Sequence, residues 1–154
     1  MLEGEVSAMH EQVIRTLNEF LRGRYMGIHQ YGHLIRNTKD ERLKQQLQRY
    51  QEHAEIGAKK IAKRIEELGG EPVDGVGLMG KFQEWMQQLK GYPEDTEEIL
   101  QQAYIGENKY GIHLSHRMVA GELDPESKHL VDDILEEDQK RVNQIKQQLT
   151  VPMK

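Results

Sequence analysis

Residues 100–121 read LQQAYIGENKYGIHLSHRMVAG, and this stretch decides which fold the chain can adopt. At helical spacing, one face of it carries small, apolar or aromatic residues with a single carboxylate among them: Leu100, Ala103, Glu107, Tyr110, Leu114 and Met118. The pattern predicts a long helix with Glu107 in the middle of its buried stripe. A buried carboxylate needs a cation, a hydrogen-bonding network or a metal ion as its partner. Which of these Glu107 has is the functional question.

The composition of the whole chain favours helices over sheet. Charged residues make up 31% and aromatic residues 6% of its 154 residues, and this length predicts one domain over residues 1–154. The formal net charge of -5 argues against nucleic acid or an anionic membrane as a partner. The chain has no cysteine, which excludes disulfides and iron–sulfur clusters. Neither a transmembrane run nor a signal-peptide pattern is present, so we expect a cytoplasmic protein.

Apolar periodicity and capping signals predict four long helices, over residues 8–37, 39–68, 96–120 and 125–149, and a short helix over 81–90. Ser7, Thr38 and Asp95 are the expected N-caps, and Gly69-Gly70 is the expected end of the second helix. The expected inward residues of the first helix are Val13, Leu17, Phe20, Leu21, Ile28, Tyr31 and Ile35. Those of the second are Leu43, Leu47, Tyr50, Ala54, Gly57, Ile61, Ile65 and Leu68. Those of the helix over 125–149 are Val131, Ile134, Asp138, Arg141 or Val142, Ile145 and Leu149.

The lengths of the connections indicate how the helices are arranged. A few residues join the first two long helices and the last two, so we expect each pair to form an antiparallel hairpin. The link between the two pairs has about 27 residues, which is typical of a four-helix bundle with one long crossover. Gly27-Ile28-His29 recurs as Gly111-Ile112-His113, which suggests that the hairpins are copies of one another. The predicted fold is an all-α, antiparallel four-helix bundle whose crossover contains a short helix.

The sequence resembles the ferritin-like superfamily, in particular the rubrerythrin and bacterioferritin branch and its small bacterial domains of unknown function. The resemblance covers residues 10–149. It rests on the architecture, on Gly106-Glu107 in the third helix, and on IEELGGEP at residues 65–72. It implies a ferritin-like fold with a di-iron or di-manganese site, to which two helices each give a Glu and the other two each give Glu-x-x-His. It also implies a homodimer.

Carried across position by position, the metal-site pattern meets arginines where ligands are expected. The inward positions concerned are Arg24 on the first helix, Ala54 and Gly57 on the second, Glu107 on the third, and Asp138 and Arg141 on the fourth. We therefore expect Arg24 and Arg141 to take the role of the metal ions and to neutralise Glu107 and Asp138 by bidentate pairing. Tyr25, Tyr31, Tyr50, Tyr104 and Tyr110 are candidate hydrogen-bond donors to these charges.

Two functional hypotheses follow from this set of residues. In the first, the chain is a ferritin-like protein without its di-metal centre. It then needs no cofactor and is not an enzyme, and it acts as a structural, stress-related or interaction module. In the alternative, a shift of register by one residue brings Glu107, Glu137, His53 and His29 into a site for iron or manganese. The protein would then be a di-iron or di-manganese oxidase or peroxidase, or an iron-handling protein.

Overall fold

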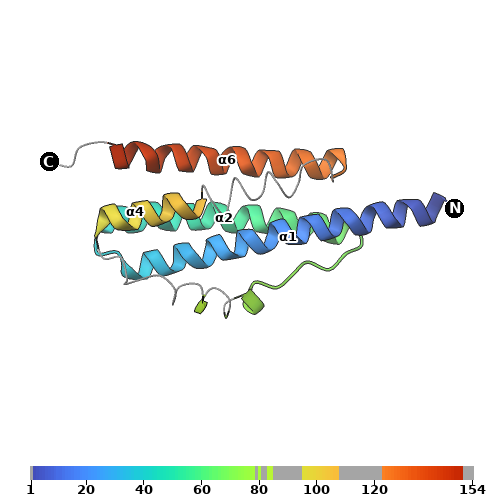
Figure 1. Cartoon of the computed structure of the whole chain (residues 1–154), viewed down its shortest axis with the longest axis horizontal. Helices are drawn as coiled ribbons and strands as arrows, with labels where there is room; N and C mark the ends of the chain where they lie inside the picture. The colour runs from blue at the N-terminus through green and yellow to red at the C-terminus, as the bar shows by residue number, and fades with distance from the viewer. Residues whose placement is uncertain (1, 79, 81–82, 85–94, 108–122, 151–154) are drawn as a thin grey trace.

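The structure is a computed structural model, and it describes residues 2–78, 80, 83–84, 95–107 and 123–150. These residues fold into an all-α four-helix bundle, as the connections predicted (Figure 1). Its helices are α1 (Leu2–Asn37), α2 (Glu41–Glu67), α4 (Thr96–Ile105) and α6 (Pro125–Thr150), with a 3-10 turn η1 (Val76–Leu78) after α2. None of the helices described combines the length and the apolar character that crossing a membrane requires.

The helix directions show why the chain needs a long crossover. In Figure 1, α1 and α2 form an antiparallel hairpin, and α4 runs in the same direction as α2. The chain therefore travels back along the bundle between α2 and α4, and α6 then runs antiparallel to α4. Of the predicted helix over 81–90, only residues 83–84 are described, and both are helical. The part of the predicted helix 96–120 beyond residue 107 and the repeat at Gly111 lie outside the described residues.

Two helix starts differ from the prediction. The first helix already includes Leu2, so the expectation that it begins after Ser7 was wrong: the turn before Ser7 is compatible with a helix and continues it. The N-cap of α2 is Asp40 and not Thr38. Asp40 Oδ1 accepts hydrogen bonds from the backbone N–H groups of Arg42 (2.9 Å) and Leu43 (3.3 Å). Thr38 still belongs to the end of α1, because its N–H donates to the carbonyl of Leu34 at 3.0 Å.

The end of α2 depends on a glycine in a left-handed conformation. Gly69 has φ 88°, its N–H donates to the carbonyl of Glu66, and the N–H of Gly70 donates to the carbonyl of Ile65, each at 2.9 Å. This pair of hydrogen bonds is the Schellman motif. A Cβ on Gly70 would also lie 2.7 Å from Ile14 Cγ2 on α1, so the chain passes very close to that helix.

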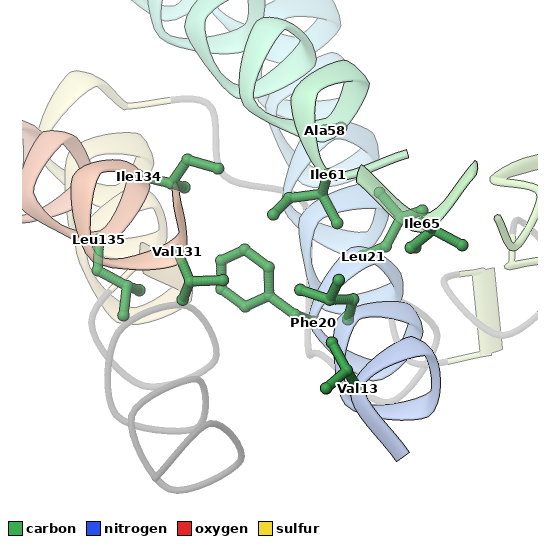
Figure 2. Close-up of a cluster of buried hydrophobic side chains, with 10 residues drawn as sticks. Val13, Phe20, Leu21, Ala58, Ile61, Ile65, Val131, Ile134 and Leu135 are labelled. Carbon is green, nitrogen blue, oxygen red and sulfur yellow. The ribbon is translucent and has the colours of Figure 1, made fainter. Parts of the chain in front are cut away.

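The buried apolar side chains of the described residues form two clusters along the bundle. The first, shown in Figure 2, joins α1, α2 and α6 and consists of Val13, Leu17, Phe20, Leu21, Ala58, Ile61, Ile65, Val131, Ile134 and Leu135. The second also includes α4 and consists of Tyr31, Leu34, Leu43, Leu47, Tyr50, Ile99, Leu100, Ala103 and Ile145. On α1, Leu34 takes the fully buried position that the sequence assigned to Ile35, which is half-buried.

A smaller polar cluster fixes the start of α6 to the end of α2. Arg64 donates to Asp124 Oδ2 at 2.8 Å and to Ser127 Oγ at 2.9 Å, and Asp124 Oδ2 also accepts from the backbone N–H of Ser127 at 3.3 Å. Burial disfavours the Asp124 carboxylate. The hydrogen bonds from Ser127 and Arg64 outweigh that effect and lower the pKa of Asp124.

We predict opposite effects for two glycine substitutions. A Cβ at Gly27, inside α1, would meet no described atom within 4 Å, so Gly27→Ala should raise the free energy of unfolding by up to about 1 kcal/mol through helix propensity. Gly69→Ala forces a side chain into the left-handed region and should lower it by about 1 kcal/mol. Urea unfolding of the two variants checks this. Equal effects of the same sign would contradict the role of Gly69 as the left-handed residue that ends α2.

The Arg64–Asp124 pair also predicts a pH dependence. The folded-state pKa of Asp124 is lowered, so its carboxylate stabilises the fold at neutral pH, and this contribution is lost as the pH falls below about 4. Asp124→Asn keeps an oxygen that can accept from the backbone N–H of Ser127 but loses the charge. It should lower the free energy of unfolding by about 1 kcal/mol at pH 7. The unfolding free energies of the variant and the wild type should converge in acid, and a difference that stays constant down to pH 3 would contradict this role.

Candidate functional site: a buried ion-pair network

Four charged side chains form a polar layer between the two apolar clusters. On α1, Arg24 comes between Leu21 of the first cluster and Tyr31 of the second. On α6, Asp138 and Arg141 fall in the same way between residues of the two clusters. The fourth member, Glu107, follows α4 directly. All four are buried, with exposed fractions from 0% for Asp138 to 9% for Glu107.

Asp138 is the centre of this network. Arg24 binds it in a bidentate manner: Nη2 donates to Oδ1 at 2.9 Å and Nη1 donates to Oδ2. Arg141, one turn further along α6, donates from its own Nη2 to Oδ1. The Arg24 guanidinium also lies over the ring of Phe20, 5.6 Å from its centroid, which connects the polar layer to the first apolar cluster. Both oxygens of a fully buried carboxylate are thus held by guanidinium groups.

Among the described residues, two donors hold Glu107, both at one oxygen. Its Oε1 accepts from Arg141 Nε at 3.2 Å and from the hydroxyl of Tyr31. Residues 106–107 adopt a π-helical turn, an irregularity that is frequent at functional positions. A Cβ on Gly106 would meet the amide end of the Gln30 side chain, which would have to move; in the structure its Nε2 donates to the carbonyl of Gln102 at 3.0 Å. Gln30 thus holds the end of α4 against α1.

The electrostatics of the layer keep both arginines charged. Burial lowers the pKa of each guanidinium, but the neighbouring carboxylates more than compensate. The net effect is a raised pKa for Arg24, chiefly through Asp138, and for Arg141, through Glu107 and Asp138. Burial and the charge of Glu107 raise the pKa of Tyr31 well above its ordinary value, so its hydroxyl remains a neutral donor. Two cations and two anions balance, and the layer has no net charge.

The residues of this layer do not fit the di-metal centre that the sequence resemblance implied. A guanidinium has no lone pair to offer a metal ion, and it competes for the carboxylate oxygens that would otherwise be ligands. Arg24 and Arg141 occupy Asp138 in this way, and Arg141 also occupies Glu107. On α2, the buried residues between Tyr50 of the second cluster and Ala58 of the first are Ala54 and Gly57, neither of which carries a ligand atom.

The alternative set of metal ligands is only partly brought together. His53 on α2 and Glu137 on α6 are both exposed and line one groove. His29 is half-buried on α1 and its Nε2 donates to the carbonyl of Gly75 at 3.1 Å, while Glu107 belongs to the buried layer. Within residues 2–78, 80, 83–84, 95–107 and 123–150, no three His, Asp or Glu side chains form a group that could hold a metal ion.

Two polar contacts were not singled out from the sequence: the hydrogen bond of Tyr31 to Glu107, and an amide pair between α2 and α6. Tyr31 was one of five tyrosines expected as candidate donors. Its position seven residues after Arg24, two helical turns along the same face, distinguishes it from the others. The side chains of Gln46 and Gln148 form a reciprocal amide pair, at 2.7 and 2.8 Å, which ties α2 to α6. Nothing in the pattern of either helix points to this pair, because glutamine is common on exposed helical faces.

One family profile matches the chain, and it carries the description of a domain of unknown function (DUF2383). It matches residues 12–118, which contain Arg24, Tyr31 and Glu107 but not Asp138 and Arg141. Comparison with curated proteins and with solved structures gave no match.

The network predicts a large difference between two nearby arginines. Arg24→Leu leaves Asp138 buried with one of its two cationic partners gone and should lower the free energy of unfolding by about 3 kcal/mol or more. The matched control is Arg22→Leu. Arg22 is half-exposed and pairs only with Glu19 among the described residues, so its loss should cost no more than about 0.5 kcal/mol. Denaturant unfolding measures both, and a fully stable Arg24→Leu variant would contradict a network that depends on this arginine.

Proposed function

The chain belongs to the family described as a domain of unknown function (DUF2383), and we propose that it is a ferritin-like bundle in which arginines replace the metal ions. In this proposal the centre of the bundle is structural. The protein acts as a structural or interaction module, and it does not catalyse oxidation at a metal centre.

The observation that carries this proposal is the way in which Asp138 is held. Arg24 contacts both of its oxygens, and Arg141 contacts one of them while binding Glu107 through Nε. Bidentate guanidinium–carboxylate pairing satisfies the geometry and the charge of a buried acid without a metal ion. A metal ion entering this layer would have to displace a guanidinium and leave it buried without its partner, which is strongly unfavourable.

The ferritin-like part of the proposal is supported by position and topology. The acids Glu107 and Asp138 come from elements that each reach the middle of the bundle, between the two apolar clusters. Asp138 and Arg141 are spaced i, i+3 on one face of α6, the spacing that the acid and histidine of a di-iron protein use. The long crossover that follows α2 agrees with the connectivity of that superfamily.

The metal content of the purified protein tests the proposal. The full chain is expressed in medium supplemented with iron and manganese, and its metals are measured by elemental analysis together with its ultraviolet–visible spectrum. We expect far less than one equivalent of either metal per chain, because guanidinium groups occupy the carboxylates. About two equivalents per chain, the content of a di-metal centre, would overturn the proposal and favour the alternative at His53, Glu137, His29 and Glu107.

A variant with metal ligands introduced at the central positions extends this test, because it is expected to gain metal. Arg24→Glu, Ala54→Glu, Gly57→His and Arg141→His together restore a ligand at each of the four central positions that lack one. This variant should gain iron or manganese where the wild type binds little. A control that carries only Ala54→Glu and Gly57→His keeps both arginines and should gain much less. Equal metal uptake by the converted variant and the control would mean that the arginines do not block the site.

A further inference from the structure

After α2 ends, the chain runs along α1 as a short segment without helical structure (Figure 1). We call its residues 71–75, which lead up to η1, the strap. Asn18 on α1 holds the beginning of the strap. Its Nδ2 donates to the carbonyl of Glu71 at 3.1 Å, and its Oδ1 accepts from the backbone N–H of Val73 at 2.9 Å. Both polar atoms of one side chain thus bind the backbone of the strap.

A second anchor holds the other end of the strap at Gly75. His29 Nε2 donates to the carbonyl of Gly75 at 3.1 Å. The ring of Tyr25 packs against the same residue so closely that a Cβ on Gly75 would lie 2.9 Å from Tyr25 Cδ1. Burial and the charge of Asp74 raise the pKa of Tyr25, which agrees with a strap that lies close to this side chain. The strap is therefore attached at both ends to one helix.

The spacing of the anchors matches the length of the strap. Asn18, Tyr25 and His29 follow one another at seven and four residues, so they share one face of α1. From Asn18 to His29 the helix rises by about 16 Å. From Glu71 to Gly75 a chain spans at most about 14 Å. A nearly extended strap has little slack between its anchors, so we expect the loss of one anchor to weaken the other.

The strap covers one side of the first apolar cluster. Val73 is half-buried and packs against that cluster, as do Ile14 and Tyr25 of α1. Glu71 and Asp74 are exposed. The strap thus buries little apolar surface, whereas α1, α2 and α6 each contribute several fully buried side chains to the clusters. Segments of this kind open at a lower free energy than the core to which they are attached.

We propose that the strap is a lid that opens and closes on α1 as one unit while the helices remain folded. On opening, Val73 leaves the first apolar cluster, and the face of α1 that carries Asn18, Tyr25 and His29 is uncovered. An apolar surface that the closed protein hides thereby becomes accessible. This inference goes beyond the proposed function and does not depend on it, because none of these residues belongs to the ion-pair layer.

Hydrogen exchange at the Val73 amide, followed by NMR on the full, isotopically labelled chain, measures the opening. This N–H lies outside the helices and is bonded to Asn18, so its exchange reports release of the strap. We expect its rate to be independent of urea well below the unfolding transition, because local opening exposes little surface. The amide of Ile61, a fully buried residue inside α2, should exchange faster as urea is added, because it requires unfolding of the bundle.

His29→Ala tests whether the two anchors open together. This variant removes the hydrogen bond to Gly75 and leaves the one between Val73 and Asn18 in place. The loss of one hydrogen bond should speed exchange at Val73 about threefold or more if the strap opens as a unit. The matched control is His10→Ala, at an exposed position of the same helix, which should change this rate less than about twofold.

Three outcomes would overturn the proposal. Exchange at Val73 that rises with urea as steeply as at Ile61 would mean that the strap opens only when the bundle unfolds. An unchanged rate at Val73 in His29→Ala would mean that the residues of the strap detach one at a time. Exchange at Val73 as fast as in an unstructured peptide would mean that the strap does not close on α1 in solution.

Discussion

The rest of the structure depends on the compensation of one carboxylate. Asp138 is fully buried, and an isolated carboxylate in such a place would cost far more free energy than a small domain has in reserve. Two guanidinium groups remove that penalty, and they come from different helices, α1 and α6. The bundle can therefore close only in an arrangement that brings these helices together at this level. The apolar clusters on either side of the layer would tolerate small shifts of the helices, whereas the ion pairs would not.

This constraint also explains the residues that surround the layer. Arginine is a long side chain, and on α2 the buried residues between Tyr50 of the second cluster and Ala58 of the first are the small Ala54 and Gly57. Sliding one helix past another by a turn would move a guanidinium into an apolar cluster and leave a buried acid unpaired. The polar layer thus specifies the register of the helices, a role that buried polar groups are known to have in helical assemblies.

Much of this arrangement could be predicted from sequence, because the helical period assigns residues to faces. The inward positions of α2 from Leu43 to Ile65 are buried as expected, and Arg24, Glu107, Asp138 and Arg141 stood out as charges on apolar stripes. The helical period cannot decide which of two nearby residues on the same helix face is the buried one. Leu34 and Ile35 both fit the stripe of α1, and Thr38 and Asp40 both fit an N-cap. Packing against α4 and the backbone hydrogen bond of Thr38 decide these choices, and neither is encoded in one helix alone. The groove at His53 and Glu137 could not be predicted for the same reason, since residues of α1, α2 and α6, which are far apart in sequence, line it.

The separation of the paired charges along the chain has a consequence for the kinetics of assembly. Arg24 and Asp138 are 114 residues apart, so their pairing closes a loop that contains most of the chain. Loop closure of this size cannot precede the contacts that bring α1 and α6 together, and the charges keep their hydration until then. We therefore expect the ion pairs to form after the main barrier to folding. Interactions that form late in this way act mainly on the rate of unfolding, so the layer determines how long the bundle stays folded and has little influence on how fast it forms.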